Sequence, residues 1–291
     1  MRATLRITLQ DSFLSRLAID IGGTHLRYEL IGETEVCGNM SSRDSELAHF
    51  IGTMIEKYSD IDAVAISFAG QVHDGTILSA PNIETEIVDI QAHFESKYGI
   101  RVRIENDLNC AALAESVYWG EENLVALYSG TGLGSGIIEK GEIVYGSRGL
   151  AGEIGHIPYR EAPFACGCGK HNCIELYASG SGIEKWMAHL DCKEPVDLDR
   201  LFRSGSESCR SIAEKYIDAL LYAAATLVTL CNPKIVVLGG GVIRHNPFVL
   251  ESLNARLGDF ALHAAMEDLR LEASHIENAS LEGAKLLLDT M

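Results

Sequence analysis

The feature that most constrains the fold is a pattern that occurs twice in the chain. Each copy has an apolar strand, a turn rich in glycine and threonine, and a second strand. The turns are Asp20-Ile21-Gly22-Gly23-Thr24 and Gly130-Thr131-Gly132-Leu133-Gly134. The strands are expected at Leu17–Ile21, Leu26–Ile31, Leu124–Ser129 and Gly136–Glu139. Two equivalent units of this kind predict an internal duplication of topology.

Helices and strands alternate through the rest of the chain, which indicates an α/β fold with partly parallel sheets. Segment Leu47–Tyr58 repeats apolar residues at helical spacing, so it predicts an amphipathic helix. Further helices are expected near 89–98, 107–118, 182–189, 207–231, 248–257 and 281–289. Further strands are expected at Ala63–Phe68, Val102–Glu105, Ile143–Tyr145 and Lys234–Leu238.

A chain of 291 residues predicts two domains. We expect a smaller domain over residues 1–118 and a larger one over 119–279, with a hinge near residue 118. The helix within 280–291 is expected to fold back onto the first domain.

Composition limits the compartment and the partners. The net charge of −17 argues against nucleic acid and against anionic membranes as partners. No signal segment and no apolar run of about 18 residues is visible, so no membrane span is expected. The eight cysteines do not form a secreted disulfide framework, because three cluster in one segment and the others are scattered. We therefore expect a cytoplasmic protein.

The two turns are candidate phosphate sites. Glycines such as Gly22, Gly23, Gly130 and Gly132 let a backbone approach a phosphate closely, and hydroxyls can donate to it. The hydroxyls come from Thr24 and Thr131, and Asp20 could hold Mg²⁺. A plain hairpin turn explains either one alone, but two at equivalent places favour a nucleotide clamped between the domains.

A third glycine run, Gly239-Gly240-Gly241, follows the strand at 234–238. It could let an adenosine lie flat on the backbone. Close packing of a helix on the strand explains the same glycines equally well.

Asn106 and Asp107 lie where a strand passes into a helix. Both residue types are favoured as helix N-caps, which is the simpler interpretation of the pair. The functional interpretation is a general base, because a carboxylate there can accept a hydroxyl proton while the oxygen attacks phosphorus.

The segment 149–175 carries the most specific chemistry. His156, Cys166, Cys168 and Cys173 supply one imidazole and three thiols, which suits a tetrahedral zinc. Four protein ligands close the coordination shell, so the metal is expected to be structural. Two acidic residues flank these ligands, and with His156 they could present hydrogen-bonding groups to a polyol. They are Glu153 and Glu175.

Together these motifs resemble the ROK family, which contains bacterial glucokinases and related hexose kinases. The matching stretches are LAIDIGGTHLR at 17–27, ENDLNCAALAE at 105–115, SGTGLGSGII at 129–138, GLAGEIGH at 149–156, CGCGKHNCIE at 166–175 and VVLGGG at 236–241. Two positions depart from the family pattern. Asn172 stands where many members have Gly, and Ala69-Gly70-Gln71-Val72 stands where relatives often carry Gly-Pro beside the sugar.

The resemblance implies an actin-like ATPase (ribonuclease H-like) fold with the active site in an interdomain cleft. It implies ATP and Mg²⁺ at the two turns, with Gly239 and Gly240 also on the nucleotide. Asp107 would take the proton of the sugar 6-hydroxyl. One ring nitrogen of His156 would bind zinc and the other would face the sugar. The residues expected around the sugar are Gly70, Asn82, Asn106, Asp107, Glu153, His156 and Glu175.

A hexose, most often glucose, is the substrate that the resemblance implies, because some N-acetylmannosamine kinases lack the glutamate at the position of Glu153. N-acetylglucosamine, N-acetylmannosamine and fructose stay open as alternative substrates. A sugar-responsive transcription regulator is less favoured, since only about 16 residues precede the first strand where regulators carry a DNA-binding module. A non-catalytic sugar-binding protein is less favoured because Asp107 and both turns are present. The family also implies a homodimer.

Overall fold

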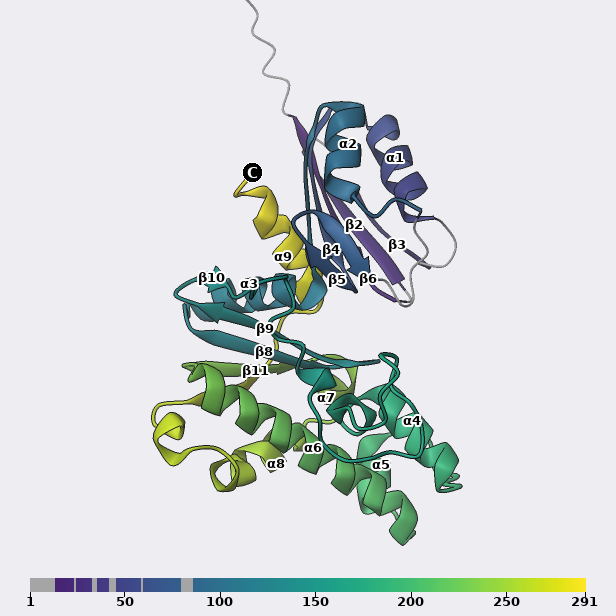
Figure 1. Ribbon diagram of the computed structural model, residues 1–291, viewed down its shortest axis with the longest axis vertical. Helices are drawn as coiled ribbons and strands as arrows, with labels where there is room; N and C mark the ends of the chain where they lie inside the picture. The colour runs from purple at the N-terminus through teal and green to yellow at the C-terminus, as the bar shows by residue number, and fades with distance from the viewer. Residues whose placement is uncertain (1–13, 24, 33–35, 42–45, 59, 80–85) are drawn as a thin grey trace, which may run out of the picture.

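The structure is a computed structural model that describes residues 14–23, 25–32, 36–41, 46–58, 60–79 and 86–291 (Figure 1). Two predicted ligand-binding residues, Thr24 and Asn82, lie outside these ranges. Within the described residues the chain builds two five-stranded sheets and one two-stranded hairpin.

The first sheet has the strand order β3-β2-β1-β4-β7. β1 runs antiparallel to β2 and parallel to β4, and β4 runs parallel to β7. The central strands are buried along nearly their whole length, as their apolar runs predict. The bounds are β1 (Ser15–Ile21), β2 (His25–Ile31), β3 (Val36–Ser41), β4 (Ile61–Phe68) and β7 (Arg101–Asn106).

The second sheet, with the order β10-β9-β8-β11-β12, repeats this arrangement. β8 runs antiparallel to β9 and parallel to β11, and β11 runs parallel to β12. The predicted duplication of topology is therefore confirmed. The bounds are β8 (Leu124–Ser129), β9 (Leu133–Glu139), β10 (Glu142–Ile143), β11 (Ile235–Gly239) and β12 (Arg270–Ala273).

Most predicted strands differ from the structure by one or two residues at an end, and for two strands the pairing explains the difference. β9 begins at Leu133 rather than Gly136, because Leu133 already pairs with Ser129 across the turn. β10 ends at Ile143 rather than Tyr145, because only its two residues pair with β9.

Two helices, α1 (Leu47–Lys57) and α2 (Ile90–Tyr98), cover one face of the first sheet (Figure 1). Their buried side chains include Ile51 and Phe94, which share a core with Ile66 of β4. We call the first sheet with these helices and the hairpin of β5 (Gln71–His73) and β6 (Thr76–Ser79) the first lobe.

Helices α3 (Asp107–Trp119) and α9 (Ala279–Leu288) lie between the two sheets (Figure 1). α9 packs on β1 and β4, α3 packs on β8 and β9, and the two helices pack on each other. A Cβ at Gly283 of α9 would lie 2.0 Å from the carbonyl oxygen of Cys110 in α3. Glycine therefore lets the two helices approach closely.

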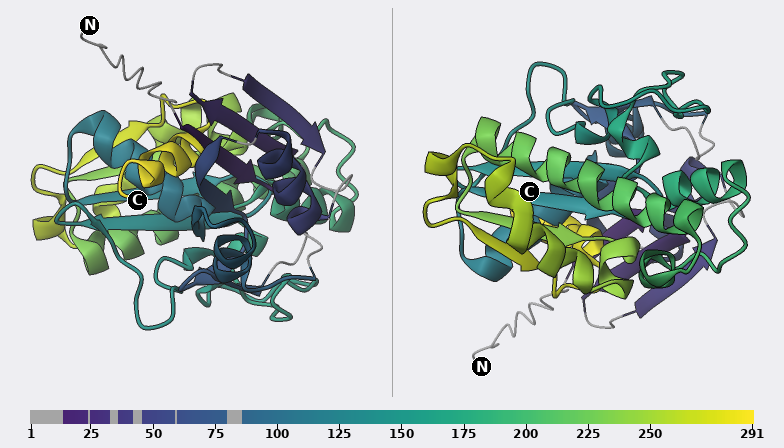
Figure 2. Two further views of the ribbon diagram at one scale, coloured as in Figure 1. Left: turned by 90° about the horizontal axis from the view of Figure 1, so that it is seen from above. Right: turned by 90° about the horizontal axis from the view of Figure 1, so that it is seen from below.

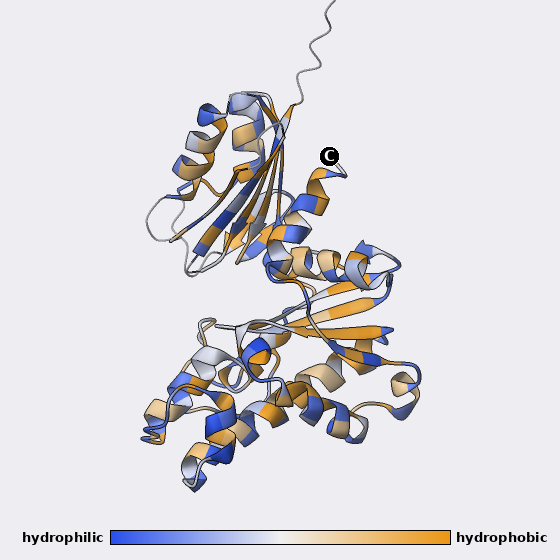
Figure 3. Ribbon diagram, turned by 180° about the vertical axis from the view of Figure 1, so that it is seen from behind, coloured by the Kyte–Doolittle hydropathy of each residue, from blue (hydrophilic) through white to orange (hydrophobic). Residues whose placement is uncertain are grey.

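The long helix α6 (Glu207–Cys231) runs along the outer face of the second sheet (Figure 2). It packs with α4 (Gly180–His189), α5 (Leu198–Arg203) and α8 (Phe248–Arg256) around a core of apolar strands (Figure 3). We call the second sheet with these helices the second lobe. Its remaining elements are α7 (Gly241–His245), η1 (Ile154–His156), η2 (Ile174–Leu176), η3 (Leu257–Asp259) and η4 (His263–Met266).

Sequence patterns missed β3, β5, β6, β12, α5 and α7. Each spans only three to six residues. An alternating or helical pattern this short does not stand out from the flanking loops.

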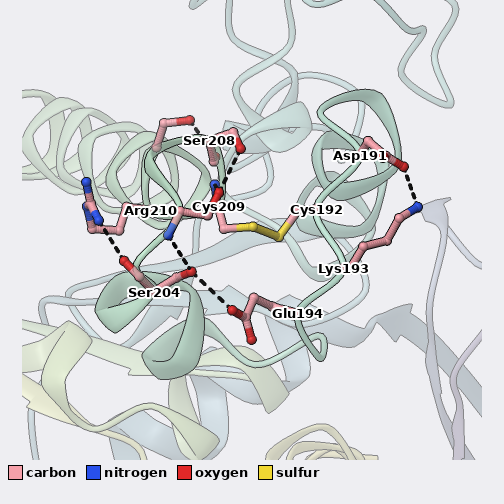
Figure 4. Close-up of a disulfide and its surroundings, with 10 residues drawn as sticks. Asp191, Cys192, Lys193, Glu194, Ser204, Ser208, Cys209 and Arg210 are labelled. Atoms are coloured by element: carbon pink, nitrogen blue, oxygen red, sulfur yellow. Dashed lines mark hydrogen bonds and ion pairs between the residues drawn. A yellow bond between two sulfur atoms is a disulfide. The ribbon is translucent and has the colours of Figure 1, made fainter.

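A disulfide joins Cys192, which follows α4, to Cys209 in the first turn of α6 (Figure 4). The sequence analysis treated both cysteines as scattered and predicted no bond between them. They are 17 residues apart with no spacing motif, so only the fold brings them together. The bond closes the segment that contains α5.

Among the described residues, none of the helices combines the length and the apolar character that a membrane span requires.

Candidate active site

Asn106 and Asp107 stand at the junction of β7 and α3. The Oδ1 atom of Asn106 accepts the N–H groups of Leu108 (2.9 Å) and Asn109 (3.1 Å), so Asn106 is the N-cap. Its Nδ2 donates to the carbonyl of Gly70 (3.0 Å) and to Oδ1 of Asp107 (3.1 Å). The cap residue thus also connects the loop at Gly70 to the candidate base.

Asp107 is half-buried, and its pKa is raised to about 7. Burial is the largest cause, and the nearby carboxylates of Asp20 and, to a smaller extent, Glu153 add to it. These three acids come from β1, α3 and the loop before η1, so the fold gathers them from distant parts of the chain. A carboxyl with a pKa near neutrality is suited to proton transfer.

Asp20 is only 3% exposed at the end of β1. Its Oδ1 accepts the hydroxyl of Ser67 (2.9 Å), and its Oδ2 lies 3.2 Å from Nη1 of Arg27. Burial raises its pKa, although both partners counteract this. A buried carboxylate at the start of the first glycine turn suits Mg²⁺, since such cations prefer oxygen ligands.

Glu153 and His156 lie side by side, with Oε2 of Glu153 3.8 Å from Nε2 of His156. Gln71 of β5 donates from Nε2 to Oε1 of Glu153 (3.4 Å), which connects the first lobe to this pair. The Nδ1 atom of His156 points the other way, 3.6 Å from Sγ of Cys166. The two ring nitrogens therefore face a carboxylate and a thiol respectively.

Glu175 bridges the segment of thiols and the second glycine turn. Its Oε2 accepts the backbone N–H of Leu133 (3.1 Å), and its Oε1 lies 3.5 Å from Sγ of Cys166. A Cβ at Gly132 would come within 2.7 Å of the same Oε2. One oxygen of Glu175 is thus already bonded to the turn, a contact that the sequence did not indicate.

The four predicted metal ligands come together. Nδ1 or Nε2 of His156 and the sulfurs of Cys166, Cys168 and Cys173 all lie within 4.8 Å of one another. Sγ of Cys168 and Sγ of Cys173 are 3.4 Å apart. A tetrahedral zinc separates such ligands by about 3.3–3.8 Å, so the donor set fits a closed zinc site. Burial and the adjacent thiols raise the pKa of Cys173 to about 12, so a cation is needed to keep all three sulfurs ionised.

The turn after β8 is bonded to the start of α4. Gly180 donates its N–H to the carbonyl of Gly130 (2.8 Å), and Ser181 donates to that of Thr131 (3.1 Å). Beside this turn lies a cavity of about 350 Å³. Its walls come from α4, from the residues before α5 and from α7: Gly180, Ile183, Val196, Asp197, Leu198, Gly241, Val242, His245 and Asn246.

Only one residue of the third glycine run faces this cavity. Gly239 ends β11, and a Cβ there would lie 2.3 Å from the ring of Tyr128. Gly240 has a φ of 87°, and a Cβ there would lie 2.4 Å from the carbonyl oxygen of Ser129. Packing therefore accounts for these two glycines, and Gly241 is the one that lines the cavity.

The predicted residues thus form three groups: Asn106 and Asp107 with Gly70, Glu153 with His156 and the thiols, and the second turn with Glu175. Sequence reasoning gave no role to Arg27 or to most of the cavity wall, and it placed the loop of Gln71 beside the sugar without predicting the contact of Gln71 with Glu153. Arg27 was visible only as part of the first strand pair, and no motif marks the segment before α5.

The family of this chain follows from its similarity to known proteins. Residues 16–291 match the model of the ROK family. The chain belongs to the ROK family. An N-acetyl-D-glucosamine kinase of Vibrio vulnificus is 28% identical to this ROK protein over 297 residues, with 92% of this chain and 97% of the relative covered.

Solved structures agree with this assignment. A ROK family glucokinase from Streptomyces griseus, in complex with glucose and AMPPNP, has a TM-score of 0.76 at 25% identity and covers 94% of this chain and 98% of its own. A ROK hexokinase from Thermus thermophilus has a TM-score of 0.76 at 26% identity and covers 95% of this chain and 100% of its own. This ROK protein therefore has the actin-like ATPase fold and is a sugar kinase.

Proposed function

We propose that this ROK protein transfers the γ-phosphoryl group of ATP to the 6-hydroxyl of a hexose bound between the two lobes. The observation that carries the proposal is Asp107, whose pKa of about 7 arises where acids of both lobes converge. A base with such a pKa is half ionised near neutral pH and can still accept a proton efficiently.

In this mechanism the carboxylate of Asp107 takes the proton of the sugar 6-hydroxyl. The hydroxyl oxygen forms a bond to the γ-phosphorus while the bond from that phosphorus to the bridging oxygen breaks, leaving ADP. Asn106 positions Asp107 because its Nδ2 donates a hydrogen bond of 3.1 Å to Oδ1 of Asp107. Closure of the lobes would exclude water, which otherwise competes as the acceptor.

The other sugar hydroxyls would be held by Asn106, Glu153 and His156, with Gly70 and Asn82 at the border of the site. The Nε2 atom of His156 and the Oε2 atom of Glu153 form a donor–acceptor pair, which suits two neighbouring hydroxyls. Glu175 would contribute its remaining oxygen, because the other is bonded to Leu133.

The nucleotide phosphates would lie between the two glycine turns, and the cavity of about 350 Å³ would take the adenine. Cavities of this volume are at the lower end of those that hold small ligands. The residues proposed on the phosphates are Gly22, Gly23, Thr24, Gly130, Thr131 and Gly132, with Asp20 on Mg²⁺. When bound, Mg²⁺ would neutralise the charge that develops on the phosphates.

The zinc ligands would act on the sugar site indirectly. His156 belongs to both the proposed zinc site and the proposed sugar site, because its Nδ1 faces Cys166 and its Nε2 faces Glu153. Zinc on Nδ1 would fix the tautomer and the orientation of the ring.

N-acetylglucosamine and glucose are the two sugars with specific support. The Vibrio vulnificus relative, which aligns with this chain over 97% of its length, is named an N-acetyl-D-glucosamine kinase. Glucose is supported by the glucokinase structure that contains it. We propose a sugar of glucose configuration and place N-acetylglucosamine first. A homodimer remains a prediction from the family resemblance, and a cytoplasmic location remains a prediction from the cysteine usage.

The test is a coupled assay of ADP release across glucose, N-acetylglucosamine, N-acetylmannosamine, fructose and mannose. We expect one sugar of glucose configuration to give the highest kcat/KM and its 6-phosphate to be the product by mass spectrometry. A 6-deoxy analogue of that sugar serves as the control and should give no turnover. If no sugar raises ADP release above background, the proposal is wrong.

A further inference from the structure

A larger groove, of about 760 Å³, lies apart from the sugar and nucleotide residues. It follows the outer edge of β7, the last strand in the order of the first sheet. Both lobes line it: β7, α2 and the β5–β6 hairpin from the first, and Tyr145 and Gly146 after β10 from the second. None of the residues that we assign to sugar or nucleotide is among its described lining residues.

Arg103 is the cation of this groove whose charge is not compensated. Its guanidinium donates to the hydroxyls of Thr290 (3.2 Å) and Tyr145 (3.3 Å). Among the described residues no carboxylate lies within 4.0 Å of its nitrogens. The other two basic residues differ, since Arg101 pairs with Asp62 and His73 lies 3.5 Å from Asp74.

Two acids in the lining are already bonded to neighbours. Oε1 of Glu95 accepts the backbone N–H of Val102 (3.1 Å). Oε1 of Glu105 accepts Nδ2 of Asn109 (2.8 Å) and the N–H of Asn106 (2.9 Å). These bonds orient the two carboxylates but leave their negative charge, and Glu105 also lies near the hydroxyl of Tyr145. Arg103 is the lining arginine without a carboxylate partner among the described residues, so its guanidinium is where an anionic group would bind.

The strand edge adds a backbone donor. The N–H of Val102 is turned outward to Glu95, so the N–H of Ile104, two residues on, lies on the same edge of β7. No hydrogen bond of this N–H occurs within the part of the chain that the structure describes. A guanidinium, a phenol hydroxyl and a backbone N–H together are the donors that carboxylates and phosphates bind.

We propose that this groove is a second ligand site, for a small organic anion that carries a phosphate or carboxylate group. The volume exceeds what an inorganic ion needs and lies within the range of small-molecule sites. The anionic group would be held by Arg103, Tyr145 and the N–H of Ile104.

A ligand in this groove would contact both lobes at once and so favour one relative position of the two. The bond from Arg103 to Tyr145 already crosses from β7 to the segment after β10. The lining also adjoins the catalytic residues, since Glu105 immediately precedes Asn106 and Asp107 and Val72 follows Gln71. The site is therefore placed to change sugar affinity as well as to bind.

The experiment measures direct binding, so its outcome does not depend on the kinase proposal. The full chain is titrated with inorganic phosphate, citrate and glycerol 3-phosphate, none of which is a substrate or product of the proposed kinase reaction, by isothermal calorimetry and thermal shift. Arg103→Gln removes the charge, Tyr145→Phe removes one hydroxyl, and Arg256→Gln is the control. Arg256 is a half-exposed arginine on α8 whose partner is Asp218.

We expect at least one of the two organic anions to bind the native chain, and Arg103→Gln to weaken that binding at least tenfold. Tyr145→Phe should weaken it less, and Arg256→Gln should leave it unchanged. Phosphate alone should bind more weakly than the organic anions. The proposal is overturned if none of the three probes binds, or if Arg103→Gln binds them as the native chain does while keeping its melting temperature.

Discussion

The pKa of Asp107 links a single side chain to the pH dependence of turnover. Because a general base works in its deprotonated form, kcat/KM should rise with pH and reach half its plateau near pH 7. Asp107→Asn should lower kcat by about 10²–10⁴-fold and abolish this dependence. The measurement is a pH–rate profile, with sugar binding by calorimetry as the control for folding. Full turnover in the variant would exclude Asp107 as the base.

The same raised pKa should destabilise the native state at alkaline pH. The folded pKa of about 7 exceeds the ordinary 3.8, so the native state binds this proton more tightly than the unfolded chain does. The favourable contribution is complete below pH 3.8 and is lost as pH rises through 7. Asp107→Asn should therefore raise the free energy of unfolding at pH 8, by on the order of 1–3 kcal/mol. Asp74→Asn, at a side chain that is 89% exposed, is the control and should change little.

The cysteine ligands should affect turnover through geometry. Cys166→Ser should remove most of the bound zinc, raise the KM for sugar and lower the melting temperature, because the ring of His156 loses its fixed position. Metal content by elemental analysis and steady-state kinetics check this together. Cys37→Ser, at an exposed cysteine outside the cluster, should change neither. A metal-free native protein with full activity would contradict the zinc assignment.

At the level of elements, the contact of α9 with α3 depends on Gly283. Replacing glycine by alanine inside a helix ordinarily stabilises it by about 1 kcal/mol. Here the new Cβ would lie 2.0 Å from the carbonyl oxygen of Cys110, so Gly283→Ala should instead destabilise the fold by about 1–3 kcal/mol. Urea unfolding measures the change. Gly258→Ala, where a Cβ would meet nothing within 4 Å, is the matched control. A stabilised Gly283→Ala variant would refute the close packing.

The disulfide closes a loop that forms part of the wall of the cavity proposed for adenine, so it should affect both nucleotide binding and the stability of the second lobe. Val196, Asp197 and Leu198 line the cavity and lie inside the loop that Cys192 and Cys209 close. Reduction with dithiothreitol should lower the free energy of unfolding by about 3 kcal/mol and raise the KM for ATP.

The matched variant for this prediction is the double replacement Cys192→Ser and Cys209→Ser. It should behave as the reduced protein does and should not respond to the reductant, which separates the disulfide from the zinc thiols. Equal stability and equal KM for ATP in the oxidised protein and the double variant would contradict the prediction.

At the scale of the whole molecule, the architecture was largely predictable and the site only in part. The two apolar strand pairs and the long periodic segment at 207–231 are strong patterns, and they predicted both sheets and α6. Asp107 and the four residues that cluster as possible metal ligands could be picked out because they lie in short motifs. The contact of Gln71 with Glu153, the wall of the cavity and the disulfide could not be, because these contacts join segments far apart in the sequence and depend on the docking of the lobes.

The position of α9 has a consequence for how the protein is made. Its residues Leu281, Ala284 and Leu287 share a core with Ala18 and Ala65 of the first sheet. This helix follows the second lobe in the sequence, so it leaves the ribosome after all the strands of both sheets. During translation the face of the first sheet that packs against α9 therefore stays exposed to solvent while the second lobe folds. An amino-terminal fragment that stops before α9 should therefore expose this apolar face, and nascent chains at that stage are natural clients for chaperones.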